Sequence, residues 1–201
     1  MDFKNLEKDL LIFLDENLKV TGRKNFILGV SGGLDSAVVS VLCKKVAPTY
    51  AKIMPTNSSN QVNLDDAINH CKAFDINYEI CPIDKLIKTY EKIFLNKKIS
   101  THRIGNLSAR IRMMVLYDLS EELDAVVVGT SNLSELMLGY GTIFGDYNTT
   151  SKEIYHGHTP SVINQIHKRP NNVYSMDVGA NFCKNLKILE IKSKTEFEVE
   201  I

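Results

Sequence analysis

A glycine-rich segment near the start of the chain has the residue types that phosphate binding requires. Residues 31–36 read SGGLDS, between an apolar run at 26–30 and a segment at 36–46 whose apolar residues have helical spacing. In a strand–loop–helix arrangement, the loop N–H groups and the helix N-terminus point at whatever occupies the loop. The two glycines let an anion approach the backbone closely, and the two serines add hydroxyl donors. The segment therefore predicts a phosphate-binding loop.

Asp35 is unsuited to a loop that binds bare phosphate, because its negative charge repels the anion. A magnesium ion between the carboxylate and the phosphates removes the conflict, so Asp35 is predicted to bind Mg²⁺. The alternative is an ordinary strand-to-helix turn that Asp35 or Ser36 caps. The patterns G-x-x-x-x-G-K-[ST] and G-x-G-x-x-G are both absent, so the segment is neither a Walker loop nor a dinucleotide fingerprint.

Polar side chains also fall near the ends of predicted elements later in the chain. Thr130 follows the strand predicted at 125–129, and ligands of open parallel sheets bind at the carboxyl ends of strands. Glu135 comes where the next helix is expected to begin, a position at which an acidic side chain can cap the helix. Arg110 and Arg112 lie on one helix but point in different directions, so they cannot both face one ligand.

The apolar patterns predict the elements that must position these side chains. Helices are predicted at 6–18, 36–46, 63–74, 83–94 and 107–122. Strands are predicted at 26–30, 51–54, 78–83 and 125–129. This alternation predicts an α/β fold, an open parallel sheet with helices on both faces. After residue 146, turn-forming clusters interrupt the alternation, and only 186–191 has a strand pattern.

Composition favours a single domain that acts on small molecules. The 201 residues are 44% hydrophobic, which is enough for one substantial core. The 24 basic and 24 acidic residues balance, so nothing in the net charge favours binding to nucleic acid or to an anionic membrane. The first residues fit neither a signal peptide nor a membrane span, and the four cysteines lack C-x-x-C spacing. We expect a cytoplasmic protein with reduced thiols.

The SGGLDS segment resembles the S-G-G-x-D-S signature of the ATP pyrophosphatases, which cleave ATP between its α and β phosphates. Residues 105–117 and 129–146 are similar to the matching stretches of bacterial ammonia-dependent NAD synthetases. The resemblance covers about residues 1–146 in order and spacing, and we treat 147–201 as a divergent segment without a separate domain. It implies a Rossmann-like, adenine nucleotide alpha hydrolase-like fold and a homodimer.

The resemblance also implies an activity and its residues. The reaction would adenylate the nicotinate carboxylate of deamido-NAD with ATP and then form NAD with ammonia, releasing AMP and pyrophosphate. No room is expected for a glutaminase domain. The implied ATP-binding residues are Gly29, Val30, Ser31, Gly32, Gly33, Leu34, Asp35, Ser36 and Thr130. Asp35 and Glu135 would be catalytic and bind Mg²⁺, and Arg110 would bind deamido-NAD, whereas Arg112 is predicted to lie on a solvated helix face.

The family's later lysine and substrate-binding stretch is not recognisable in residues 147–201. Lys152 lies in the right neighbourhood but lacks the flanking pattern. Three interpretations stay open: a working NAD synthetase, a truncated or divergent relative that binds ATP with little or no catalysis, and an ATP pyrophosphatase that acts on another substrate. From residues 147–201 we expect ATP binding with slow or no synthesis of NAD.

Overall fold

The computed structural model of the protein describes residues 3–94, 99–132, 135, 140–146, 167–168, 174–177, 187–191 and 197–200. Most of the segment that we expect to diverge, including Lys152, lies outside the described residues.

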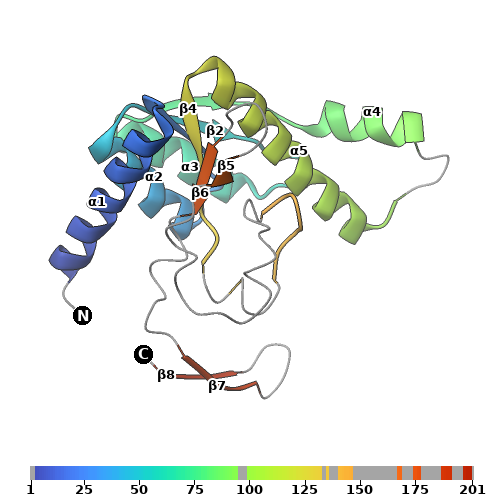
Figure 1. Ribbon diagram of the computed structural model, residues 1–201. Coiled ribbons are helices and arrows are strands. Elements are labelled where there is room, and N and C mark those ends of the chain that lie inside the picture. Colours follow the sequence, from blue (N-terminus) through green and yellow to red (C-terminus); the bar gives the residue numbers. More distant parts are fainter. Residues whose placement is uncertain are drawn as a thin grey trace.

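Helices and strands alternate along the first part of the chain (Figure 1). The helices are α1 (Phe3–Thr21), α2 (Leu34–Val46), α3 (Gln61–Ala73), α4 (Asp84–Phe94) and α5 (Thr101–Glu122). The strands are β1 (Asn25–Gly29), β2 (Thr49–Ile53), β3 (Asn77–Ile80), β4 (Ala125–Gly129), β5 (His167–Lys168), β6 (Tyr174–Asp177), β7 (Lys187–Ile191) and β8 (Phe197–Glu200).

The main sheet has the strand order β3-β2-β1-β4-β6-β5. Strands β3, β2, β1, β4 and β6 pair in parallel, and β5 pairs antiparallel with β6. The chain moves outward from β1 to β3 and then returns to place β4 on the other side of β1. The strands β1 and β4 are therefore neighbours, and the loops that follow them run in opposite directions. Open parallel sheets bind ligands at such a point.

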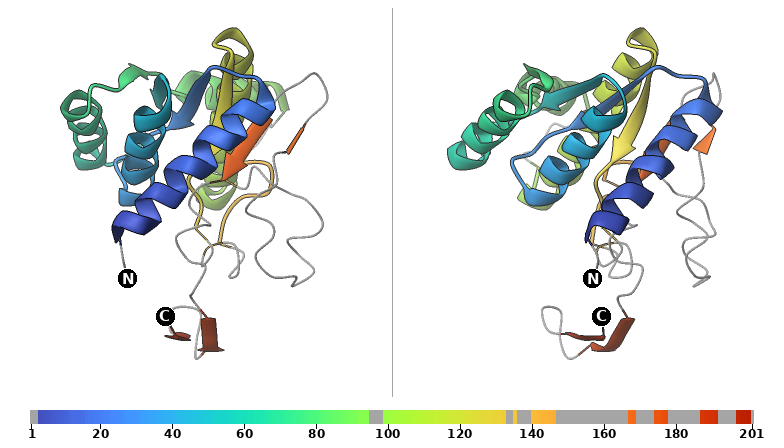
Figure 2. Two further views of the ribbon diagram at one scale, coloured as in Figure 1. Left: turned by 60° about the vertical axis from the view of Figure 1, so that its left-hand side comes forward. Right: turned by 90° about the vertical axis from the view of Figure 1, so that its left-hand side faces the viewer.

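Alternate residues of the central strands pack into two separate cores. Phe26 and Leu28 of β1 face one cluster, which α1, α2 and α3 cover. Ile27 of the same strand faces the other cluster, which α4 and α5 cover. Figure 2 shows α1, α2 and α3 beside one another. The predicted parallel sheet with helices on both faces is confirmed.

The structure differs from the predicted boundaries in two informative places. Helix α5 begins at Thr101, before the predicted start at 107, because the side chain of Ser100 accepts a hydrogen bond from the N–H of Arg103. Strand β6 extends the parallel sheet next to β4, although the sequence around it shows no strand pattern. The strand predicted at 186–191 is confirmed as β7, which pairs with β8.

Candidate functional site

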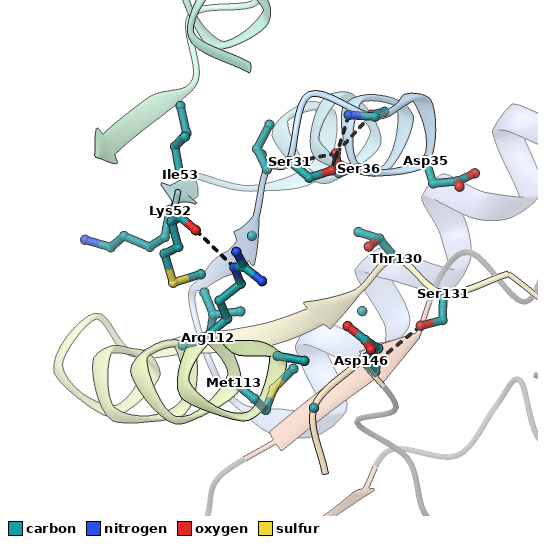
Figure 3. Close-up of a pocket in the computed structure, with 18 of the residues that line it drawn as sticks. Ser31, Asp35, Ser36, Lys52, Ile53, Arg112, Met113, Thr130, Ser131 and Asp146 are labelled. Carbon is teal, nitrogen blue, oxygen red and sulfur yellow. Dashed lines mark hydrogen bonds between the residues drawn. The ribbon is translucent and has the colours of Figure 1, made fainter. Parts of the chain in front are cut away.

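A cavity of about 590 Å³ lies at the carboxyl ends of β1, β2 and β4 (Figure 3). This size is typical of small-molecule sites. Its walls come from the loop after β1, the end of β2, the start of α3, the inner face of α5, the end of β4 and the segment 140–146. The predicted residues that line it are Gly29, Val30, Ser31, Gly33, Asp35, Ser36, Thr130 and Glu135. Gly32, Leu34 and Arg110 are not among the described residues that line it.

The hydroxyl groups of the loop hold the loop itself in shape. Ser36 is buried, and its Oγ donates to the carbonyl oxygen of Gly33 at 3.0 Å and accepts from the N–H of Ser31 at 3.3 Å. The N–H of Gly33 donates to Ser31 Oγ at 3.2 Å. Helix α2 has no side-chain cap at Gly33, so its first N–H groups are left for an anion.

Gly32 allows α3 to pack against the loop. Its φ is +86°, which favours glycine, and a Cβ built there would lie 2.1 Å from the carbonyl oxygen of Asn63. No side chain fits in that space. The second glycine of the motif is less restricted, because a Cβ on Gly33 would meet only Ser31 Oγ at 3.3 Å.

Asp35 lies in the first turn of α2 with its side chain exposed at the cavity. Within the described chain its carboxylate forms no hydrogen bond or ion pair, unlike that of Asp146, which accepts from the N–H of Thr142 at 2.8 Å. Figure 3 shows Asp35 across from Thr130. A carboxylate held at a cavity without a protein partner can serve a metal ion.

Glu135 is engaged in a reciprocal contact with Asn132. Its Oε2 accepts from the N–H of Asn132 at 2.9 Å, and its own N–H donates to Asn132 Oδ1 at 2.9 Å. This is the hydrogen-bond pattern of a capping box. The capping interpretation of Glu135 is therefore supported, while its place in the cavity wall keeps the metal-binding interpretation open.

Arg110 and Arg112, both on α5, differ in burial. Arg110 is exposed, and its Nε donates to the carbonyl oxygen of Ile143 at 3.2 Å. Arg112 is half-buried in the cavity wall, and its Nε donates to the carbonyl oxygen of Met54 at 3.0 Å. Burial lowers the pKa of Arg112, and the charge of Asp146 partly opposes this effect. The prediction that Arg112 lies on a solvated face is wrong, because α5 turns this side chain toward the end of β2.

The segment 140–146 is fastened to α5 and to the end of β4. Thr142 Oγ1 donates to Asn106 Oδ1 at 2.8 Å, and Ser131 Oγ donates to the carbonyl oxygen of Asp146 at 3.1 Å. A Cβ on Gly145 would lie 2.8 Å from that of Ala109, so glycine permits this close approach. The sequence pattern gave no signal for these contacts, which depend on the tertiary fold.

Lys52 is a second cavity residue that the sequence analysis did not select. Its side chain is 10% exposed and forms an ion pair with Glu79 on β3. The hydrogen bond and the positive charge lower the pKa of the Glu79 carboxyl group. The available signal was a lysine inside a strand that has no other charged residue.

No three or more histidine, cysteine, aspartate or glutamate side chains gather into a metal-binding group within the described residues. A metal ion in this cavity would therefore depend on oxygens of a bound ligand as well as on the protein. None of the helices in the described part of the chain has the length and apolar content needed to cross a membrane.

Comparison with known proteins identifies similar sequences and folds. The sequence profile of the NAD synthase family matches residues 6–180. The NH(3)-dependent NAD(+) synthetase of Campylobacter jejuni (strain 81-176) is 40% identical over 148 residues, or 73% of this chain and 59% of that protein. The enzyme of the same name from Helicobacter pylori (strain HPAG1) is 46% identical over 149 residues, or 72% of this chain and 56% of that protein.

A solved structure shares the arrangement of the elements. The NH3-dependent NAD synthetase from Campylobacter jejuni, in complex with the nitrate ion, matches with a TM-score of 0.69 and 38% identity, over 77% of this chain and 71% of that one. The present chain spans less than two thirds of the length of the two sequence relatives. The family match continues past residue 146, where we expected the resemblance to end.

Proposed function

The chain belongs to the NAD synthase family, and on this basis we propose that it catalyses the ammonia-dependent synthesis of NAD from deamido-NAD and ATP. The observation that carries the proposal is the shared cavity. The loop 31–36, Thr130 and Glu135 are far apart in the sequence, yet they line one space at the point where the strand order reverses. Such a point is where an open parallel sheet binds a nucleotide.

In the proposed reaction, an oxygen of the nicotinate carboxylate attacks the α-phosphorus of ATP, the bond from that phosphorus to the α,β-bridging oxygen breaks, and pyrophosphate leaves. Ammonia then attacks the acyl carbon, the bond to the phosphate oxygen breaks, AMP leaves, and the extra proton passes to water. Neither step needs a protein nucleophile. The chain contributes by holding the reactants in place and by placing donors where negative charge develops.

The loop supplies most of the proposed nucleotide contacts. Its backbone N–H groups and the start of α2 would hold the phosphates, and Thr130 would contact the nucleotide from the end of β4. The residues proposed to bind ATP are Gly29, Val30, Ser31, Gly32, Gly33, Leu34, Asp35, Ser36 and Thr130. Gly32 and Leu34 would act only through their backbone. Arg110, at the outer side of α5, is proposed to bind deamido-NAD.

The residues present fit a magnesium ion that is shared with the phosphates. Mg²⁺ commonly takes one or two carboxylates from the protein and the remaining ligands from phosphate and water. Asp35 meets this requirement because its carboxylate is exposed at the cavity and has no partner among the described residues. Glu135 is proposed as a second ligand. When bound, the ion would neutralise negative charge as pyrophosphate leaves.

If the proposal is right, purified protein incubated with ATP, Mg²⁺, ammonium and deamido-NAD forms NAD, AMP and pyrophosphate in equal amounts, whereas residues 147–201 predict slow or no formation of NAD. Omission of deamido-NAD should abolish all three products. ADP as the main product would contradict the proposal. ATP binding without turnover would favour the alternative of a relative with little or no catalysis, and AMP formed only with another carboxylate would favour a different substrate.

Glu135→Gln separates the two interpretations of Glu135. The amide oxygen of glutamine can still accept from the N–H of Asn132, so the capping contact and the thermal stability should persist. If the carboxylate binds Mg²⁺, the rate should fall on the order of a hundredfold because a metal ligand has lost its charge. The rate of NAD formation at saturating ATP and the thermal unfolding curve, each measured for the variant and the wild type, distinguish the two interpretations. An unchanged rate would leave Glu135 as a capping residue only.

We also propose a homodimer that forms through exposed apolar side chains near α4 and α5. On α5, Ile111 is buried, but Met114 is 56% exposed. At the end of α4, Ile93 and Phe94 are 64% and 67% exposed. Light scattering at micromolar concentration should give twice the chain mass of 22.6 kDa, and Phe94→Glu should shift it toward the monomer. A monomeric mass for the wild type would contradict the proposal.

A further inference from the structure

The positive charge of Arg112 lies in the cavity wall, and none of the described residues forms an ion pair with it. Its Nε is fixed to the carbonyl oxygen of Met54 at 3.0 Å, and in the part of the chain that the structure describes no carboxylate forms an ion pair with it. Figure 3 shows the guanidinium group of Arg112 extending from α5 into the cavity, between the end of β2 and Thr130. The side chain is therefore anchored at one edge and open toward a ligand at the other.

The nearest carboxylate does not satisfy this charge. Asp146 acts on Arg112 only through its electrostatic field, and its Oδ2 accepts from the N–H of Thr142 at 2.8 Å. Burial of a charged group without a partner is unfavourable, and it lowers the pKa of Arg112. An oxyanion placed between the terminal nitrogens and the loop would relieve this cost with hydrogen bonds that are assisted by charge.

We propose that Arg112 binds the α-phosphate of the nucleotide, the phosphate that AMP retains after pyrophosphate has left. The inference rests on the proposed function and adds a residue to its site. The anion-binding start of α2 and Asp35 form one wall, whereas Arg112 reaches the cavity from α5 at the end of β2. With its terminal phosphates at the loop, a bound nucleotide would extend its α-phosphate toward Arg112.

The guanidinium group is suited to this role during both chemical steps. Its planar donors hold two oxygens of one phosphate at once, and its charge persists at every working pH. The bond to Met54 fixes the side chain in advance, so little freedom is lost when the nucleotide binds. Arg112 would therefore bind the group that is attacked in the first step and released as part of AMP in the second.

Comparison of AMP with adenosine tests the assignment, because the two differ only by this phosphate. Calorimetry on the full chain should show that the wild type binds AMP more tightly than adenosine. Arg112→Gln should reduce that preference about ten- to a hundredfold, as expected for hydrogen bonds to a charged group. Arg112→Lys keeps the charge without the paired donors and should give an intermediate preference. Arg103→Gln, an exposed change on the same helix, is the control and should change nothing.

Each outcome bears on the proposal. Equal affinity of the wild type for AMP and adenosine would overturn it, with no variant needed. An unchanged preference in a folded Arg112→Gln protein would also overturn it and leave Arg112 as a tether between α5 and β2. If Arg112→Gln does not fold, the preference of Arg112→Lys decides. If the wild type forms NAD but Arg112→Gln keeps the preference for AMP over adenosine, only this inference is refuted. If Arg112→Gln loses that preference but the wild type forms no NAD, only the proposed function is refuted.

Discussion

Gly32→Ala is expected to abolish ATP binding. An alanine Cβ would lie 2.1 Å from the carbonyl oxygen of Asn63 and 3.0 Å from its Cα. Because these are backbone atoms, no side-chain rotation can relieve the clash, and the loop or the start of α3 must move. The φ of +86° adds strain on the order of 1 kcal/mol for any residue with a Cβ. A displaced loop no longer directs its N–H groups at the phosphates.

Gly22→Ala is the matched control for this change. Gly22 also has a positive φ, +69°, but a Cβ there would meet nothing within 4 Å. Gly22→Ala should therefore lower the free energy of unfolding, measured in urea, by about 1 kcal/mol and leave the affinity for ATP unchanged. ATP affinity is measured by calorimetry on both variants. Wild-type affinity in Gly32→Ala would mean that the loop does not hold the nucleotide in the way we propose.

Asp35→Asn is expected to weaken the dependence of ATP binding on magnesium and to lower the rate of NAD formation on the order of a hundredfold or more. Asparagine has the same shape but lacks the charge that attracts the cation. Without magnesium, the variant should bind ATP at least as tightly as the wild type, because the repulsion between Asp35 and the phosphates is gone. The substitution should therefore weaken ATP binding when magnesium is present and should not weaken it when magnesium is absent.

Titration of ATP with and without magnesium checks this expectation. Asp66→Asn removes an exposed carboxylate from α3, away from the cavity wall, and should behave as the wild type in both titrations. A magnesium effect of equal size in Asp35→Asn and the wild type would show that Asp35 is not a metal ligand. Equal affinities in the absence of magnesium would not contradict the prediction, whereas weaker binding there would.

The central strands could be predicted from the sequence because their neighbours on both faces are apolar. Residues 125–129 are all buried in the sheet, so the strand reads as an uninterrupted apolar run. The loop 31–36 could be predicted for a related reason, since its glycines and hydroxyl groups lie between two such recognisable elements. Local pattern was sufficient where residues that line the cavity and their supporting elements are adjacent in the chain.

The role of Arg112 could not be obtained in this way. Helical spacing shows that Arg110 and Arg112 point in different directions, but the packing of α5 on the end of β2 decides which one enters the cavity. The contact between Gly32 and Asn63 has the same origin, because it joins two segments through their backbones. Such contacts depend on how elements pack, and neither residue type nor spacing encodes them locally.

The pairing of β1 with β4 determines when the site can exist during folding. Asn25 pairs with Ala125 and Ile27 with Val127, so the two strands that carry the loop and Thr130 are joined across half of the chain. Closing so long a loop is entropically unfavourable, and such contacts slow the folding of parallel sheets. During synthesis, the loop 31–36 leaves the ribosome long before Thr130 does. We therefore expect the proposed nucleotide site to form only after synthesis has passed β4, and we expect ATP to stabilise the late pairing of β1 with β4 most strongly.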